Sequence, residues 1–397
     1  MTKPTIIVIG SADVIKLSLI RSLGELGYKL ISIHLGRKLI IKPLDYYSKY
    51  ISSYYFVNRS NLIDFLVQNC VDVDCKPVLF PLDDASVYII DKAHHILEKH
   101  FYYAHVNHKE GGIVELMNKS IQKAIAAESG LIVAKGWRIP YTDGEYIIPE
   151  GIEYPCFVKG ELSYGGNKSL QRKCNNYNEL RKLLDESLSS CKIPFIAEEF
   201  LPIKKNIGII GVFDGVNCIM AAKAELLVMG KGMSNGVSMF GKVSQLRDLI
   251  LLKKIEAMLK EMHYTGIFNL DFVESRGELY FLEMNYRYAA YGYGLKSAGL
   301  NLPNLFVKSM YDNKTENIHL TMDKDLFYFN EKVGLHNVLE RFISWSEYKL
   351  LEKKADVLLV RSKDDSKPYR MFFLSICQRI MIKRLSVIYR KYFHRHI

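Results

Sequence analysis

The sequence of 397 residues lacks several features that would assign a chain to a familiar class. It has no run of about eighteen apolar residues, so we expect no membrane-spanning helix. The apolar run from Thr5 to Gly10 is short and is followed by Asp13 and Lys16, which argues against a secretory signal. The seven cysteines are scattered and include no CxxC pair, which favours reduced thiols in a cytoplasm over disulfides or a zinc site.

Common signatures of cofactor or covalent chemistry are also missing. Gly10 stands alone after the first apolar run, and without a GxGxxG sequence dinucleotide binding is disfavoured. We find no Ser-His-Asp or Cys-His nucleophile, no internal repeat and no low-complexity linker. His94, His95 and His100 lie on one helical stretch, where core or surface side chains are expected rather than a metal site. At this length we expect two to four structural units.

Acidic residues are absent from the end of the chain. After Ser366 come eight Lys or Arg and no Asp or Glu, which leaves +3 of the net charge of +11 for the first 366 residues. Apolar residues from Phe373 to Tyr392 recur there at helical spacing, which predicts a basic amphipathic helix. Such a helix either docks on the body or lies on an anionic membrane surface. Nucleic acid is a less favoured partner, because no aromatic stacking platform accompanies the helix.

The most informative stretch runs from Gly266 to Arg287. Its alternating apolar residues predict two strands around a turn, with Phe268, Leu270, Phe272, Tyr280, Leu282 and Met284 on one face. Asp271, Glu283 and Asn285 then project from the other face, and Arg287 returns to the same side. An odd-length loop centred on Gly277 would place Asp271 opposite Glu283. A two-residue loop would oppose Asp271 to Leu282 and mix the faces, so the pattern favours the odd loop.

The polar face of this hairpin has the composition of a magnesium site. Two carboxylates and an amide oxygen that lie close together need a cation between them. Mg²⁺ prefers few protein carboxylates together with substrate phosphates. The alternative is an ordinary solvated face, because alternation alone is common.

The residues that precede this hairpin supply an ordered series of further elements. A strand, a helix and a second strand between Thr5 and His34 predict an open α/β sheet. Asp83 and Asp84 follow another strand at the end where ligands bind such sheets, although a helix cap is the plainer interpretation of Asp84. The next elements are Lys119 at a helix start, Lys159 at a strand end, a glycine-bearing loop at 160–169 and two acids at 198–199. The loop is suited to an anion, with a plain hairpin turn as the alternative.

This series, closed by Asp271 and the motif Glu283-x-Asn285-x-Arg287, resembles the ATP-grasp superfamily over roughly residues 1–310. Within the superfamily it looks like the carboxylate–amine ligase branch, similar to D-aspartate ligase and to the large subunit of carbamoyl-phosphate synthase. The resemblance implies an α/β and α+β fold in which two α+β lobes enclose the nucleotide. The expected divisions are an N-terminal open α/β domain (1–115), a small lobe (116–198), a large lobe with the magnesium site (199–312) and a C-terminal extension (313–397).

The resemblance implies a role for each matching position. Lys119 and Lys159 match lysines that hold the ATP phosphates, and Arg287 matches the basic residue at the phosphoryl group. The remaining matches are a covering loop (Ser163, Gly165, Gly166, Lys168), an adenine-reading segment (Glu198, Glu199, Phe200, Leu201) and ligands for Mg²⁺ or Mn²⁺ (Asp271, Glu283, Asn285).

Two positions depart from the family pattern. Lys204 and Lys205 occupy a region where many relatives place an acid for the ribose, which leaves Asn206 as the candidate there. Lys223 is a loose match to a basic residue near the γ-phosphate, with a surface strand lysine as the alternative.

The implied activity is an ATP-dependent joining of a carboxylate to an amine or a thiol. An acyl phosphate forms, and ADP and phosphate are released. The enzymatic alternative is phosphorylation of bicarbonate or carbamate, against which the chain has one ATP-grasp unit and no glutaminase. A biotin carboxylase is less favoured, because no matching biotin-carboxyl segment is evident.

An alternative of another class is a nucleotide-binding membrane-surface module with little catalysis, motivated by the basic tail. We expect ATP and Mg²⁺ as cofactors and small carboxylates and amines as substrates. A homodimer and a cytoplasmic location, with the inner membrane face as an alternative, complete the expectations.

Overall fold

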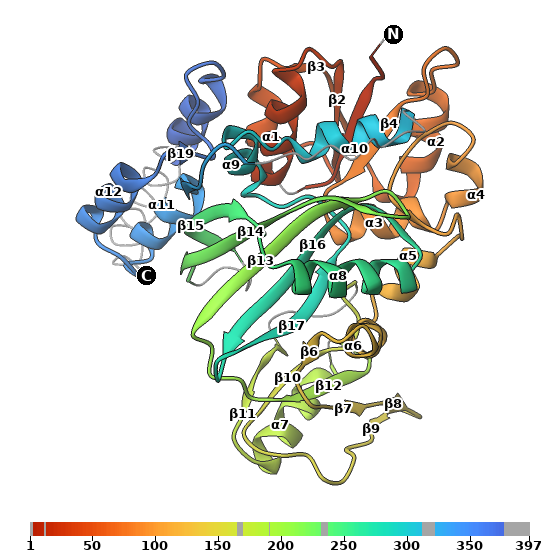
Figure 1. Ribbon diagram of the computed structural model, residues 1–397, viewed down its shortest axis with the longest axis vertical. Coiled ribbons are helices and arrows are strands. Elements are labelled where there is room, and N and C mark those ends of the chain that lie inside the picture. The colour runs from red at the N-terminus through yellow and green to blue at the C-terminus, as the bar shows by residue number, and fades with distance from the viewer. Residues whose placement is uncertain are drawn as a thin grey trace, which may run out of the picture.

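A computed structural model describes residues 3–11, 13–164, 170–189, 191–231, 237–311 and 322–376. Figure 1 shows the N-terminal α/β unit at one end of the molecule, a large twisted sheet in the middle and a small lobe at the other end. Most of the predicted basic helix falls in 377–397, outside the described residues. Among the described helices, none is long and apolar enough to cross a membrane.

The N-terminal unit is a parallel sheet with strand order β3-β2-β1-β4. The strands β1 and β2 are buried along their whole length, as expected for apolar runs covered on both faces. Its elements are β1 (Ile6–Ile9), α1 (Asp13–Gly24), β2 (Leu30–Leu35), β3 (Ile51–Val57), α2 (Leu62–Asn69), β4 (Val78–Pro81), α3 (Asp84–Asp91) and α4 (His94–Leu97), with 3-10 turns at Leu44–Tyr47 and Arg59–Asn61.

A connection containing β5 (His105–Val106) and α5 (Gly112–Leu116) leads to the small lobe. That lobe has a four-stranded sheet of order β11-β10-β12-β7. The elements of this stretch are α6 (Lys119–Glu128) and β6 (Ile132–Val133), which pack on or pair with β17 (Glu278–Asn285), and then β7 (Gly136–Ile139), β8 (Tyr141–Thr142), β9 (Glu145–Tyr146), β10 (Cys156–Gly160), β11 (Arg172–Cys174), α7 (Tyr177–Ser187) and β12 (Phe195–Glu199).

The central sheet has the order β19-β18-β15-β14-β13-β16-β17-β6, with β5 paired to β16 beside this path. It therefore takes strands from stretches that the sequence divisions assigned to the small lobe and to the C-terminal extension. The remaining elements are β13 (Lys205–Phe213), β14 (Cys218–Met229), β15 (Ser238–Gln245), α8 (Leu249–Glu261), β16 (Tyr264–Ser275), β17 (Glu278–Asn285), α9 (Gly292–Ser297), α10 (Leu302–Tyr311), β18 (Leu326–Phe329), α11 (Glu331–Leu339), α12 (Trp345–Lys354) and β19 (Val357–Leu358).

The β16–β17 hairpin confirms the predicted pairing but not the predicted loop. Ser275 pairs with Glu278, so the turn has two residues, and Arg276 and Gly277 both have positive φ, at 52° and 85°. Such a turn matches the twist of a tight hairpin. Asp271 nevertheless lies opposite Glu283, because the register shifts by one residue between Asp271 and Phe272. The prediction of an odd loop was wrong, since a β-bulge restores the alternation instead.

The bulge also changes which side chains share a face. Phe281 pairs with Phe272, their rings 5.6 Å apart between centroids, in the core that packs against α8. Tyr280 and Leu282, predicted on that core face, pack instead against Leu201 on the face of Asp271. The bulge thus gives the polar face an apolar border at the end where the small lobe attaches.

Candidate active site

The carboxylates of the hairpin form a compact polar cluster. Asn285 Nδ2 donates to Asp271 Oδ2 at 2.9 Å, and Glu283 lies directly opposite Asp271. Burial, and next the charge of Glu283, raise the pKa of Asp271 to about 7, while Arg287 acts in the other direction. Burial and the neighbouring carboxylate thus disfavour the ionised form of Asp271, and a cation bound beside it would favour that form.

A buried network beneath the cluster fixes Asp271. Asn269, two residues earlier on the same face, donates from Nδ2 to Asp271 Oδ1 at 3.3 Å and accepts a short hydrogen bond from the Tyr291 hydroxyl. The Tyr291 hydroxyl fits against Gly208, where a Cβ atom would lie 2.5 Å from it. Asn269 and Tyr291 are both buried, so the carboxylate has little freedom to turn. Sequence reasoning missed Asn269, although its place two residues before Asp271 on a strand puts it on the same face.

Lys119 connects the start of α6 to this cluster. Asn118 caps the helix by accepting from the backbone of Ser120 and Ile121. Lys119 Nζ then donates to Ser163 Oγ at 3.0 Å and lies 3.5 Å from Glu283 Oε2. The structure thus brings together a predicted phosphate lysine, the first residue of the predicted covering loop and a predicted metal ligand. Gly165, Gly166 and Lys168 of that loop lie outside the described residues.

Two lysines flank Glu198 where α6 meets the small-lobe strands β10 and β12. Lys159 Nζ and Lys123 Nζ lie 3.0 and 2.5 Å from Glu198 Oε1, and all three side chains are buried. Burial, and next the charge of Lys159, lower the pKa of Lys123 to about 8. Burial alone would raise the pKa of Glu198, but the two lysines outweigh it and hold that pKa below its usual value. Lys123 was not among the predicted residues, although its spacing of four from Lys119 puts both on one helix face.

The segment after Glu198 links the lobes. Glu199 accepts hydrogen bonds from Lys135 N at 3.2 Å and from Arg276 Nη1 at 2.8 Å. Phe200 lies under Lys173, whose Nζ is 4.6 Å from the ring centroid, and Leu201 is buried against Val273. Phe200 and Leu201 thus present apolar side chains beside the hydrogen-bonded carboxylate of Glu199. This combination suits a flat heterocycle, as the resemblance implies for an adenine.

The N-terminal unit contributes to the site through Asp84. Its Oδ1 accepts from Arg287 Nε at 3.2 Å, and Arg287 Nη2 also donates to Asn285 Oδ1 at 3.3 Å. Asp83, rather than Asp84, caps α3, in a capping box with Ser86. The helix-cap interpretation of Asp84 was therefore wrong, and Asp84 instead orients Arg287.

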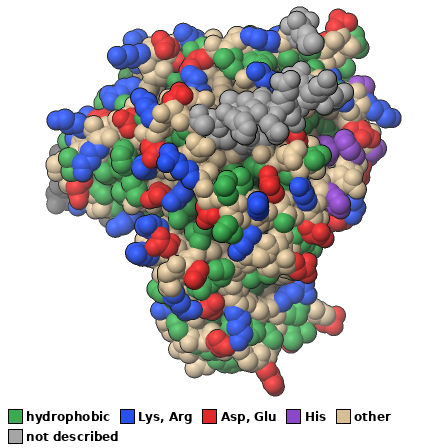
Figure 2. Space-filling view, viewed as in Figure 1, with side chains coloured by type: hydrophobic (Ala, Val, Ile, Leu, Met, Phe, Trp, Pro, Cys, Tyr) green, Lys and Arg blue, Asp and Glu red, His purple; other side chains and the backbone are tan. Residues whose placement is uncertain are grey.

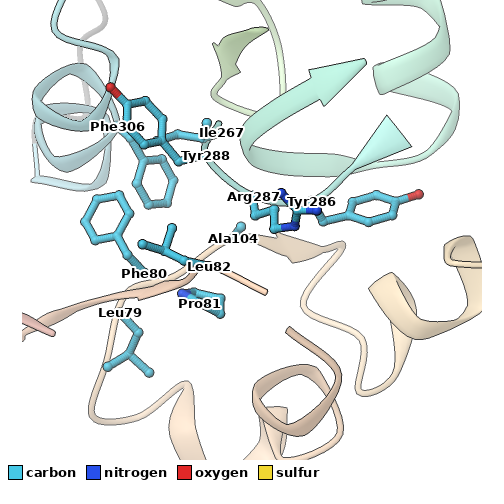
Figure 3. A pocket seen from close by; sticks show the side chains of 10 residues that line it. All are labelled: Leu79, Phe80, Pro81, Leu82, Ala104, Ile267, Tyr286, Arg287, Tyr288 and Phe306. Atoms are coloured by element: carbon cyan, nitrogen blue, oxygen red, sulfur yellow. The ribbon is translucent and has the colours of Figure 1, made fainter. Parts of the chain in front are cut away.

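A small hollow, with about 20 Å³ open to the centre of a water molecule, lies beside Arg287. Figure 3 shows the rings of Phe80, Tyr288 and Phe306 grouped on one side of it, with Arg287 at its polar end and the ring of Tyr286 pointing away. The hollow lies between β4 of the N-terminal unit and the segment after β17. The tyrosines after Asn285 mainly pack, since Tyr286, Tyr288 and Tyr291 are all buried.

Two other predicted residues, Asn206 and Lys223, lie on opposite faces of the central sheet. Gly208 pairs with Asp271, and Asn206, two positions earlier, lies on the same face as the carboxylates. Lys223 pairs with Ile209, the neighbour of Gly208, which puts its side chain on the opposite face; there its Nζ lies 2.8 Å from Glu225 Oε1. The structure therefore does not group Lys223 with the other candidates.

The fold of this chain is similar to that of several solved structures. The L-amino acid ligase from Bacillus licheniformis matches with a TM-score of 0.60 at 12% identity, over 82% of this chain and 80% of that one. The ADP complex of N5-carboxyaminoimidazole ribonucleotide synthetase matches with a TM-score of 0.61 at 16% identity, over 86% of each chain. The chain has the ATP-grasp fold. No family model and no curated protein sequence matches it.

A third structure with this fold carries ligands. It is the biotin carboxylase domain of 2-oxoglutarate carboxylase from Hydrogenobacter thermophilus, in complex with MgADP, ADP and bicarbonate. Its TM-score is 0.57 at 15% identity, over 82% of this chain and 74% of that one.

The residues of the β16–β17 cluster fit a hard divalent cation. Asp271, Glu283 and Asn285 offer oxygen ligands on adjacent positions of two paired strands. A cation there would favour the ionised form of Asp271, whose pKa is raised by burial and next by the charge of Glu283. Asn285 donates its amide nitrogen to Asp271 and accepts from Arg287 at its oxygen, so binding a cation through that oxygen would require the amide to turn and give up both hydrogen bonds.

Proposed function

We propose that this chain is an ATP-dependent carboxylate–amine or carboxylate–thiol ligase that uses Mg²⁺. The observation that carries the proposal is the cluster of Asp271, Glu283 and Asn285 with Lys119 beside it and Arg287 at its edge. Negative ligands for a metal and positive groups for phosphates thus lie side by side. That combination is the requirement for transferring a phosphoryl group from a metal-bound nucleotide.

The two lobes supply different parts of the nucleotide site. Lys119, Lys123 and Lys159 place positive charge on the small-lobe side, where it would hold the ATP phosphates. Glu199, Phe200 and Leu201 form the link between the lobes and are proposed to bind the adenine. Asn206 lies on the same face of the sheet as Asp271, two positions along β13 from Gly208, which pairs with Asp271. We propose that it reaches the ribose.

Asp271, Glu283 and Asn285 are proposed to hold Mg²⁺, which when bound neutralises charge on the phosphates. Arg287, oriented by Asp84, is proposed to bind the substrate carboxylate as it attacks the γ-phosphate. The attack forms a bond from the carboxylate oxygen to phosphorus and breaks the bond to ADP. The amine or thiol then displaces phosphate from the acyl phosphate.

The hollow beside Arg287 suggests where the acid binds. Its charged end suits a carboxylate and its lining is mostly apolar, but at about 20 Å³ it holds about one water molecule, so an acid with a side chain would bind there only after the lining side chains move. Bicarbonate is the second candidate acid, favoured because a structure with this fold binds that ion together with MgADP. Bicarbonate needs the charged end and makes no use of the apolar lining.

Phosphate release from MgATP tests the proposal. The assay compares pools of L-amino acids, D-amino acids, small carboxylates and bicarbonate, with Asp271→Asn as the inactive variant. Glu278→Gln is the matched control, because Glu278 is an exposed acid on the same hairpin. Release that depends on one pool and disappears only in Asp271→Asn supports the ligase. Nucleotide binding with no release from any pool would contradict it and favour a binding module.

A further inference from the structure

A second group of ligand atoms lies in the N-terminal unit, away from the nucleotide site. His94 on α4, Glu98 just after it and His108 in the turn after β5 each offer one atom, and these atoms all lie within 4.8 Å of one another. Figure 2 shows histidine side chains gathered at one edge of the molecule, on the side where Figure 1 places α4 and α5.

His94 presents an unsatisfied nitrogen to this group. The imidazole is 2% exposed, and its Nδ1 lies 2.9 Å from the hydroxyl of Tyr103. That hydroxyl is also 3.3 Å from the backbone oxygen of His94, and when it donates its proton there, its own oxygen accepts the Nδ1 proton. The tautomer with hydrogen on Nδ1 leaves a lone pair on Nε2. This buried Nε2 makes no hydrogen bond of acceptable geometry.

The lone pair faces another electron-pair donor. Nε2 of His94 is 3.3 Å from Oε2 of Glu98, whose side chain is 42% exposed. Two ligand atoms bound to one tetrahedral zinc ion, at about 2.0–2.1 Å each, are about 3.3 Å apart. The His94–Glu98 pair therefore already has the separation of two ligands on one ion.

His108 is held beside this pair by an unusual turn. Asn107 and His108 both have left-handed backbone conformations, with φ of 45° and 50°. The ring of His105 stacks on that of His108 at 3.8 Å, and His105 Nδ1 accepts from the His108 backbone N–H. The turn places the ring of His108 5.9 Å from that of His94, within reach of a shared ion after a small movement of an exposed side chain.

We propose that His94, Glu98 and His108 bind one divalent transition-metal ion, with zinc the best match. Two imidazoles and one carboxylate suit zinc, and water would complete a four-coordinate site. Tyr103 acts as a positioning residue, because it fixes the ring and tautomer of His94. The ion would fasten α4 to the segment after β5, a strand that pairs with the start of β16. It would thereby join the N-terminal unit to the strand that carries Asp271.

Cobalt binding to the full, tag-free chain tests this site. Co²⁺ replaces Zn²⁺ in such sites, and tetrahedral coordination gives it strong visible absorption. The titration uses an Asp271→Asn background, which removes competition from the oxygen cluster, and equilibrium dialysis with Zn²⁺ gives the stoichiometry. His108→Ala and Glu98→Gln remove exposed ligands and so leave the core of the fold intact. His100→Ala is the matched control, since it removes a histidine of the same stretch that lies outside the cluster.

We expect the background chain and His100→Ala to bind one ion with the tetrahedral spectrum. His108→Ala and Glu98→Gln should weaken binding by more than the ten- to hundredfold that loss of an outer partner typically costs, and Tyr103→Phe by about ten- to hundredfold. Zn²⁺ should also raise the Tm of the background chain but not of His108→Ala. Equal binding by all variants, or no binding by the background chain, would overturn the site and leave His94 in a simple ion pair with Glu98.

Discussion

Two carboxylates of the proposed nucleotide site, Glu198 and Asp271, have neighbours of opposite charge. Glu198 is buried between Lys123 and Lys159, which hold its pKa below the usual value. Asp271 lies beside Glu283, and burial together with that charge raises its pKa to about 7. Around Glu198 two lysines thus face one carboxylate, whereas in the hairpin two carboxylates lie next to each other, with Lys119 Nζ 3.5 Å from Glu283. The first is suited to bind an anion and the second to bind a cation.

Removing the unbalanced carboxylate should have the largest effect on activity. We expect Asp271→Asn to reduce substrate-dependent phosphate release to background, a loss of about 10²–10³-fold or more, because charge on the transferred phosphoryl group is no longer neutralised. Glu278→Gln should keep wild-type rates. Mn²⁺ binding, followed by electron paramagnetic resonance with both chains in a His108→Ala background, should fail in parallel; intact Mn²⁺ binding by Asp271→Asn in that background would show that the nucleotide-site ion is held elsewhere.

Removing the balanced carboxylate should instead affect folding. Glu198→Gln leaves two buried lysines without a countercharge, and we expect a loss of about 3–5 kcal/mol in the free energy of unfolding. Glu153→Gln is the control, because Glu153 pairs with Lys135 on the surface, where an ion pair contributes less than about 1 kcal/mol. Urea denaturation of both variants measures the difference. Equal stability of Glu198→Gln and Glu153→Gln would mean that Glu198 does not balance the charges of the two buried lysines.

The pH dependence of stability should report the raised pKa of Asp271. Its pKa is about 7 in the folded chain and 3.8 ordinarily, so between these values the folded chain binds more protons than the unfolded chain. The contribution of Asp271 to stability is therefore most favourable below about pH 4 and falls as pH rises toward 7.

Asn at this position does not titrate, so Asp271→Asn should gain stability over the wild type across that window. The gain should reach at most about 4 kcal/mol. Thermal unfolding of both chains from pH 4 to 8 measures it. Glu331, whose pKa burial also raises to about 7, is present in both chains and cancels in the comparison. A constant difference across the window would contradict the assignment.

The smallest effect is expected at Lys223. Its side chain lies on the other face of the sheet beside Glu225, so Lys223→Ala should change nucleotide affinity and turnover less than about threefold. Lys159→Ala is the contrasting variant, and we expect it to weaken nucleotide binding by about tenfold or more, the scale of one charge-assisted hydrogen bond. A large loss in Lys223→Ala would restore the role that the sequence resemblance implied.

Much of the site was predictable because it depends on short-range pattern. Alternation along two strands placed Asp271, Glu283 and Asn285 on one face, and Lys119 was expected at a helix start. The loop between the strands was not predictable in this way. A two-residue turn and a bulge produce the same pairing of Asp271 with Glu283 as the odd loop, so the alternation of residues could not distinguish them.

The sequence alone determined the order of strands and helices and the identity of the residues available for chemistry. Both follow from local periodicity, which a single stretch of chain contains. Only the tertiary structure decided that Lys123 joins Lys159 at Glu198, that Asp84 contacts Arg287 across 203 residues, and that Lys223 lies on the far face. Those contacts depend on how separate elements pack and on the register between strands, and neither is encoded in the neighbourhood of any one residue.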